Sequence, residues 1–197
     1  EIENTSLEEI INQIKIYIDR DSEKIKPLLN EVTATNYREL LRELIFLIYK
    51  SYGDISTNYV GFKSTFAELF ITPTIKALPN SKVICVIRDP RAIFASQIFP
   101  KKDYPLLYVV RQWRKSIEYI LQNISLENVY VLRYEDLVDD AQKSMEDISK
   151  FIGVAYQSNM INPEKYKDGN DSLWTQNSSY INANKKNTIN KKNKNRW

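Results

Sequence analysis

Histidine is absent from the 197 residues of the sequence, and this absence removes several classes of chemistry. A Ser-His-Asp triad and a histidine general base are both excluded. Cys85 is the single cysteine, so the chain can form neither an internal disulfide nor a zinc site with histidine or several cysteine ligands. Any acid–base chemistry must therefore use carboxylates, lysines or tyrosines, and we expect no metal.

The lone cysteine also bears on location. Cys85 lies within an apolar run, at a position where a small apolar residue is expected. A chain that builds no disulfide is typical of a reducing compartment, so we expect a cytoplasmic protein.

Long apolar runs and a strong charge imbalance are missing as well. No run approaches the length that a helix needs to span a bilayer, so we expect no membrane partner. The net charge is only +3, which by itself gives no reason to expect nucleic-acid binding. Lys and Arg gather without acids in residues 185–197, and we interpret this run as a solvated tail.

The rest of the composition is that of an ordinary globular protein. Hydrophobic residues make up 43% of the chain and charged residues 27%. A length of 197 residues suits one domain with a sizeable core, so we predict a single domain over residues 1–197. The oligomeric state is left open by the sequence.

Hydrophobic periodicity predicts where the helices and strands lie. Helices are expected over 6–18, 36–53, 66–78, 105–124 and 140–153, and strands over 58–64, 82–87 and 128–137. Strands that alternate with helices favour an α/β fold with a mainly parallel sheet. We expect 59–63, 82–87 and 129–133 to share that sheet, with helices on both faces, as in a three-layer sandwich.

Capping residues support the predicted helix ends. Ser6 and Glu9 are expected to form a capping box, and Asn36 is expected to be an N-cap. Gly53 and Gly153 are expected to end their helices.

Two predicted strands run into charged clusters. The run VICVI is followed by Arg88, and VYVL is followed by Arg133-Tyr134-Glu135-Asp136. In open parallel sheets, ligands bind at the carboxyl ends of strands, so these clusters indicate a binding site. The alternative is that both clusters are helix caps with surface charges.

The stretch KVICVIRDPRAIFASQ (82–97) has a pattern that suits an oxyanion. Arg88 at a strand end can offer paired donors to a phosphate. Asp89 and Pro90 suit the start of a helix, whose first amides favour an anion. Ser96 can add a hydroxyl donor, and its alternative role is that of a small helix residue packed on the sheet.

These residues resemble the sulfotransferase family, which uses 3′-phosphoadenylyl sulfate (PAPS). The stretch 82–97 is similar to the family's 3′-phosphate motif, and VYVLRYEDLVDDAQKSMEDISKFIGV (129–154) is similar to its second block. NSSY (177–180) and KNKNRW (192–197) resemble later segments, and GFKST (61–65) stands where many members carry a Lys-Ser/Thr strand end. The resemblance spans roughly residues 58–197. It implies a P-loop NTPase-like fold and sulfuryl transfer from PAPS to a hydroxyl or amine of a carbohydrate or small-molecule acceptor.

The resemblance also implies roles for residues in the two blocks. Arg88 and Ser96 would hold the 3′-phosphate of PAPS, and Tyr134 would lie near the adenine. The alternative for Tyr134 is an aromatic residue that covers the core at a strand end.

Residues outside these blocks receive implied roles as well. Lys63 would face the sulfuryl group or the acceptor, as the catalytic residue, and its alternative is a solvated lysine. Lys194 and Arg196 would give a second contact to the 3′-phosphate, although Asn195 stands where the family usually has glycine.

A further part of the family pattern has no counterpart here. In the family, a glycine-rich loop binds the 5′-phosphosulfate through its amides. The glycines of this chain are far apart in the sequence and form no such loop; they are Gly53, Gly61, Gly153 and Gly169. We expect the loop and its N-terminal strand upstream of residue 1, together with a carboxylate base of which Glu1 or Glu3 would be a remnant. If residues 1–197 were the entire polypeptide, we would expect no sulfuryl transfer.

Two other functions remain open. One is a non-catalytic nucleotide-binding or partner-binding remnant of the same fold. The other is a related P-loop kinase, which would need a Walker lysine and magnesium ligands, and neither is visible in the sequence.

Overall fold

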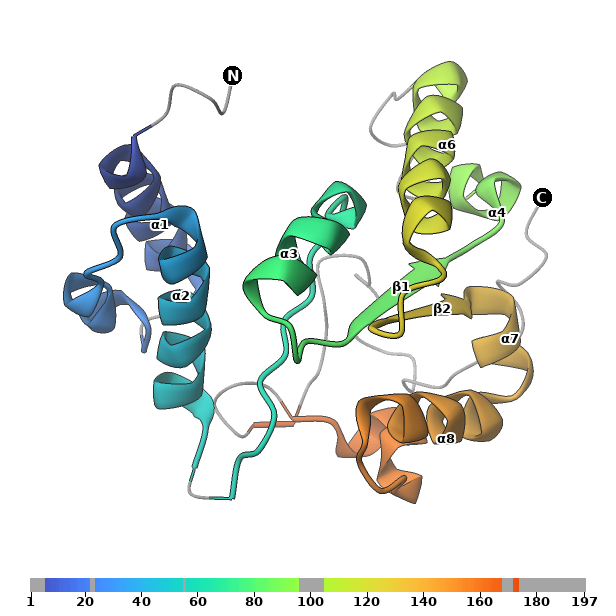
Figure 1. The fold of residues 1–197 in the computed structure, drawn as a ribbon. Helices are drawn as coiled ribbons and strands as arrows, with labels where there is room; N and C mark the ends of the chain where they lie inside the picture. The colour runs from blue at the N-terminus through green and yellow to red at the C-terminus, as the bar shows by residue number, and fades with distance from the viewer. Residues whose placement is uncertain (1–5, 22–23, 55, 96–104, 168–171, 174–197) are drawn as a thin grey trace. The chain divides into compact units, whose positions relative to one another are not determined.

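A computed structural model of the chain describes residues 6–21, 24–54, 56–95, 105–167 and 172–173 (Figure 1). The chain divides into two compact units. Unit 1 comprises residues 1–65 and 76–79, and unit 2 comprises residues 66–75 and 80–197.

Unit 1 is helical. It contains α1 (Leu7–Asp21), a 3₁₀ helix (Lys26–Glu31) and α2 (Tyr37–Tyr52). Leu29 and Leu47 are buried in its core, and Ile14 of α1 packs against them. The apolar faces that the periodicity predicted for residues 6–18 and 36–53 therefore meet in one small core.

The predicted helix caps of unit 1 are present. The Ser6 amide donates to Glu9 Oε2 at 2.8 Å, and the Glu9 amide donates to Ser6 Oγ at 3.1 Å, which completes a capping box. At the start of α2, the Glu39 amide donates to Asn36 Oδ1 at 3.0 Å. These contacts satisfy amides that have no partner within their own helices.

Gly53 ends α2 as predicted, but by a close approach and not by a left-handed turn. Its φ is −84°, which any residue can adopt. Its amide donates to Tyr49 O at 2.7 Å, and a Cβ at this position would lie 2.6 Å from the same oxygen. Glycine is therefore required here because a side chain would collide with the preceding turn.

Unit 2 contains a small parallel sheet. Strand β1 (Val83–Ile87) pairs with β2 (Val129–Arg133), from Val83 opposite Val129 to Ile87 opposite Arg133. The predicted parallel pairing of these two segments is confirmed. Among its described residues, the α-helices of unit 2 are α3 (Ile71–Ala77, whose last two residues fall in unit 1), α4 (Pro90–Phe94), α6 (Leu106–Asn123), α7 (Tyr134–Asp139) and α8 (Ala141–Ile152). Short 3₁₀ helices lie at Glu68–Phe70, Ser158–Ile161 and Pro163–Lys165.

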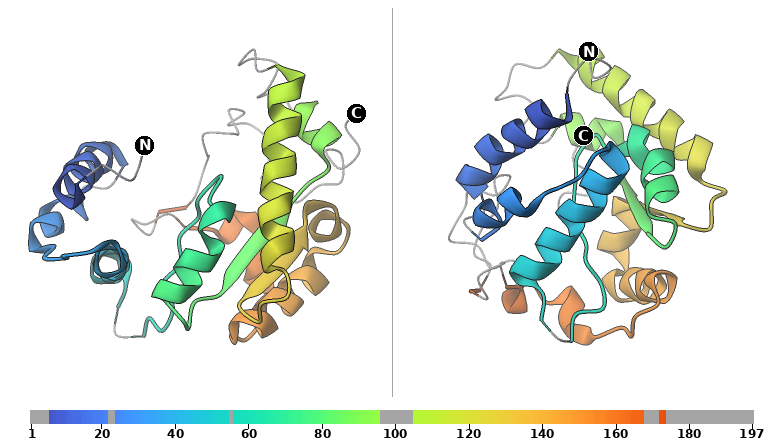
Figure 2. Two further views of the ribbon diagram at one scale, coloured as in Figure 1. Left: turned by 45° about the horizontal axis from the view of Figure 1, so that its top comes forward. Right: turned by 60° about the vertical axis from the view of Figure 1, so that its left-hand side comes forward.

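Helices cover both faces of the two strands (Figures 1 and 2). On one face, Cys85 and Val129 pack with Ile71 of α3 and Ile120 of α6 in a buried cluster. On the other face, Tyr130 lies against Phe151 of α8, with ring centroids 5.3 Å apart. This layering is the arrangement expected for parallel strands in an α/β fold.

Helix α8, which follows α7, is capped at both ends. Asp140 caps α8 by accepting the Lys143 amide at 2.9 Å. Gly153 ends α8 with a φ of 83°, in the left-handed region that favours glycine, as predicted. Among the described residues no helix is long and apolar enough to cross a bilayer.

One strand prediction is wrong, and another extends too far. Residues 58–64 are rich in β-forming types, but they pair with no strand among the described residues. The side chains of Tyr59 and Phe62 in this segment are exposed. The strand predicted over 128–137 ends at Arg133, because 134–139 forms helix α7. Glu135 and Asp136 occupy the first turn of α7, where acidic residues favour a helix start.

Candidate functional site

Arg88 and Tyr134 lie together at the carboxyl ends of the two strands. The strand register places Ile87 opposite Arg133, so the residues that follow each strand are neighbours. The guanidinium carbon of Arg88 lies 4.4 Å from the centroid of the Tyr134 ring. This distance is that of a cation–π contact, which orients the guanidinium and limits its rotamers.

The backbone beside Arg88 is held from two directions. The Trp113 indole Nε1 on α6 donates to Arg88 O at 2.9 Å. The Asp89 amide donates to Glu135 Oε1 on α7, also at 2.9 Å. Glu135 is only 8% exposed, so its carboxylate is a buried acceptor that ties the end of β1 to the start of α7.

Asp89 starts α4 as the capping residue predicted from the Asp-Pro sequence. Its Oδ1 accepts the Arg91 amide at 2.8 Å, and its Oδ2 pairs with the Arg91 guanidinium at 2.7 Å. The hydrogen bond from the Arg91 side chain lowers the pKa of the Asp89 carboxyl below its usual value. Because Asp89 already engages the Arg91 amide, and α4 has only five residues, this helix start adds little anion binding of its own.

A model of the sulfotransferase family matches residues 7–158. The chain belongs to the sulfotransferase family. The match covers most of the chain and includes both strands with Arg88, Trp113, Tyr134 and Glu135, and it confirms the family that the sequence motifs suggested. A search of curated proteins finds no match.

The structure brings together two of the residues predicted for the sulfotransferase site. Arg88 and Tyr134 form one cluster, whereas Lys63 lies in unit 1, exposed and outside any strand. The strand-end position predicted for Lys63 is therefore wrong, because residues 58–64 do not pair. Ser96, Lys194 and Arg196 lie outside the described residues, as do the residues 1–5 that include Glu1 and Glu3.

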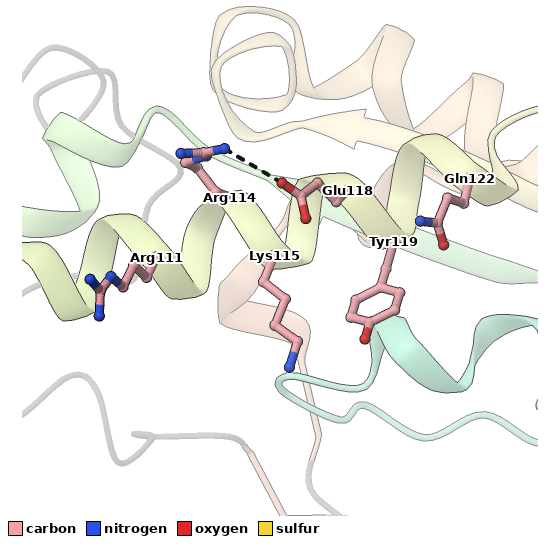
Figure 3. Close-up of a pocket in the computed structure, with 6 residues that line it drawn as sticks. All are labelled: Arg111, Arg114, Lys115, Glu118, Tyr119 and Gln122. Carbon is pink, nitrogen blue, oxygen red and sulfur yellow. Dashed lines mark ion pairs between the residues drawn. The ribbon is translucent and has the colours of Figure 1, made fainter.

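A shallow hollow on α6 of the sulfotransferase is separate from this cluster (Figure 3). Its lining side chains all come from the outward side of the helix: Arg111, Arg114, Lys115, Glu118, Tyr119 and Gln122. Arg114 and Glu118 form an ion pair of 3.7 Å. Trp113 reaches Arg88 from the inward side of the same helix, so α6 separates the hollow from the strand ends.

Trp113 and Glu135 are site residues that the sequence reasoning missed. Glu135 belongs to the charged cluster that follows VYVL, and the sequence pattern did not distinguish a buried acceptor from a surface charge. Trp113 lies in the amphipathic run 105–124, where an aromatic residue is typical of core packing. Among the described residues, no group of three or more Cys, Asp or Glu side chains is placed to hold a metal.

Proposed function

We propose that this sulfotransferase binds PAPS at the carboxyl ends of β1 and β2 and transfers its sulfuryl group to a hydroxyl or amine of a carbohydrate or small-molecule acceptor. The observation that supports this proposal best is the Arg88 guanidinium stacked on Tyr134 at a strand end. A fixed, permanently charged fork of donors suits a phosphate monoester, and an aromatic ring beside it suits a nucleotide base.

The described residues fit the donor in charge and in chemistry. Arg88 supplies a cation whose backbone is anchored by Trp113 and Glu135, so little ordering is needed when the ligand binds. In the proposal, Arg88 binds the 3′-phosphate and Tyr134 lies at the adenine. Ser96, Lys194 and Arg196 remain predicted contacts to the same phosphate.

The donor would supply an activated sulfuryl group. In an in-line displacement, the acceptor oxygen or nitrogen would form a bond to sulfur while the bond from sulfur to the 5′-phosphate oxygen breaks, and adenosine 3′,5′-bisphosphate would leave. Positioning and charge stabilisation dominate such a transfer. The protein must orient both substrates and accept the proton of the acceptor. Since the chain has no histidine, the proposed base is a carboxylate. Lys63 remains a candidate cation for the sulfuryl group, now as an exposed residue of unit 1.

The proposed cytoplasmic location rests on Cys85. This cysteine is free and buried in the cluster beneath α6. Burial raises the pKa of its thiol above the usual value, so the thiol stays protonated and unreactive. Such a cysteine serves packing, as expected for a chain that makes no use of disulfides.

Calorimetric titration with three nucleotides tests the proposed function. Adenosine 3′,5′-bisphosphate should bind roughly tenfold or more tightly than adenosine 5′-phosphate, because only the first carries the 3′-phosphate that Arg88 would contact. ATP should bind no better than adenosine 5′-phosphate. A preference for ATP would instead favour the P-loop kinase, and tight bisphosphate binding without turnover of PAPS by any acceptor would favour the non-catalytic remnant.

Glu135 offers a second test, of how the Arg88 backbone is positioned. Glu135→Ala removes the acceptor of the Asp89 amide, so bisphosphate binding should weaken by about 0.5–1.5 kcal/mol. Glu135→Gln keeps an acceptor oxygen at the same place and should recover most of that loss. Calorimetry on both variants measures the effect, and Asp136→Ala, an exposed neighbour, is the matched control.

The outcomes for Glu135 separate positioning from folding. A general folding defect would lower the melting temperature and weaken the binding of every nucleotide alike. A loss confined to the bisphosphate, and restored by glutamine, supports the positioning role. Wild-type affinity in Glu135→Ala would show that the Asp89 contact does not position Arg88.

A further inference from the structure

One side of α6, next to the side that lines the hollow, carries exposed apolar side chains. Leu107, Val110, Leu121 and Ile124 are 70%, 37%, 60% and 51% exposed. With Arg114 and Ile117 they follow one another at alternating steps of three and four residues, the spacing of a and d positions in a coiled coil. These six residues, from Leu107 to Ile124, are called the α6 seam below.

The core of unit 2 lies on the other side of the helix. Val109, Ile120 and Asn123 are buried, and Trp113 reaches the Arg88 backbone. None of these residues belongs to the α6 seam, so the seam is a second apolar face of the same helix. A helix with two apolar faces is typical of one that packs on its own core and on another helix.

The charges beside the α6 seam are complementary to those of a second copy of the helix in antiparallel orientation. Arg111 and Glu118 are seven residues apart on one flank, at equivalent heptad positions. Within one chain they are separated by two helical turns, about 10 Å, and Glu118 forms an ion pair with Arg114 at 3.7 Å. In an antiparallel pair of α6 helices, Arg111 of each chain would face Glu118 of the other, whereas a parallel pair would bring like residues to the same level.

We propose that two copies of this chain associate through an antiparallel pair of α6 helices. The layers of that pair are Leu107 with the partner's Ile124, Val110 with the partner's Leu121, and Arg114 with the partner's Ile117. Two ion pairs between Arg111 and Glu118 flank the layers. Arg114 in the central layer costs stability, but it keeps its contact to Glu118 and fixes the register, as a polar residue at an a position does.

The size of the helix sets the strength of the association. An α-helix of 18 residues is about 27 Å long, and one such helix pair buries less surface than a standard protein interface. The dimer is therefore expected to dissociate with a constant in the micromolar range, and not to be obligate for folding.

Sedimentation velocity of the full chain over a concentration series tests the proposal. The wild type should shift from monomer to dimer as its concentration rises through the micromolar range. Leu121→Glu should abolish the dimer, because it places a charge in a layer of the α6 seam. Leu173→Glu, at an apolar residue that is 63% exposed outside the seam, is the matched control and should leave the dimer unchanged.

A charge exchange tests the antiparallel orientation. Arg111→Glu and Glu118→Arg should each weaken the dimer by about tenfold, since each creates like-charged neighbours across the pair. The double variant should recover the wild-type constant. Because the two residues lie two turns apart in one chain, such recovery reports a contact between chains.

Two results would overturn the proposal. One is a monomer at all concentrations up to the solubility limit. The other is a dimer that is indifferent to Leu121→Glu or to the charge changes, which would place the interface elsewhere. Circular dichroism of each variant checks that the fold is retained, which is expected because every changed side chain is on the surface.

Discussion

Arg88→Ala is expected to weaken the binding of adenosine 3′,5′-bisphosphate by about 1.5–3 kcal/mol, roughly a 10- to 150-fold loss of affinity. The Arg88 guanidinium stacks on Tyr134 at the strand ends. The substitution would remove its charge-assisted contact to the dianionic 3′-phosphate. Isothermal titration calorimetry on the variant and the wild type measures the change. Binding of adenosine 5′-phosphate should be unaffected, because that ligand lacks the 3′-phosphate.

Two further variants sharpen the test of Arg88. Arg88→Lys keeps the charge but loses the planar fork and its stacking on Tyr134, so it should recover only part of the affinity. Arg91→Ala removes an arginine of the same motif that pairs with Asp89 and is mostly exposed, so it should have a small effect. Equal losses for both nucleotides in Arg88→Ala would mean that Arg88 supports the fold, and unchanged bisphosphate binding would remove the site assignment.

Ile120→Ala is expected to lower the free energy of unfolding by about 2–5 kcal/mol, the largest effect on stability predicted for this chain. Ile120 is 4% exposed and packs with Ile71, Cys85 and Val129, where α6 and α3 meet the sheet. The substitution removes three buried carbon atoms from this cluster and leaves a cavity. The two strands limit how far the surrounding residues can collapse into that cavity. Urea unfolding followed by circular dichroism measures the loss.

Ile124→Ala provides the matched control for this substitution. Ile124 is the same residue type at the end of the same helix, but half of its surface is exposed. At a protein concentration low enough to exclude association, its replacement should change the free energy of unfolding by about 0.5 kcal/mol or less. A loss in Ile120→Ala no larger than that of the control would show that the Ile71–Cys85–Ile120–Val129 cluster is not the centre of the core.

The elements that could be predicted from the sequence are those whose pattern is local. The helices over 105–124 and 140–153 follow from apolar spacing, and Asp89, Asp140 and Gly153 act as the caps that their types favour. Residues 58–64 show the opposite case. Their β-forming residues indicate a strand, but pairing depends on a neighbour far along the chain, which local sequence cannot supply.

The candidate site was predictable only in part, for a related reason. Both strand ends carry charged clusters, and parallel pairing brings such ends together, so the meeting of Arg88 and Tyr134 follows from the sequence once the sheet is assumed. The contacts of Glu135 and Trp113 that hold the backbone at Arg88 and Asp89 could not be predicted from the sequence. Whether Glu135 faces solvent or a buried amide, and which atom Trp113 bonds, depends on how α6 and α7 lie on the sheet.

The pairing of β1 with β2 has a kinetic consequence for the nascent chain. Each residue of β1 is paired with a residue 46 positions later, from Val83 with Val129 to Ile87 with Arg133. Closing a loop of that length costs chain entropy before any strand contact offsets it, and such distant pairings slow folding. After Arg88 has emerged from the ribosome, 46 more residues must emerge before Tyr134 can contact it. The Arg88–Tyr134 contact therefore cannot exist in any shorter intermediate of synthesis, and it arises together with the sheet.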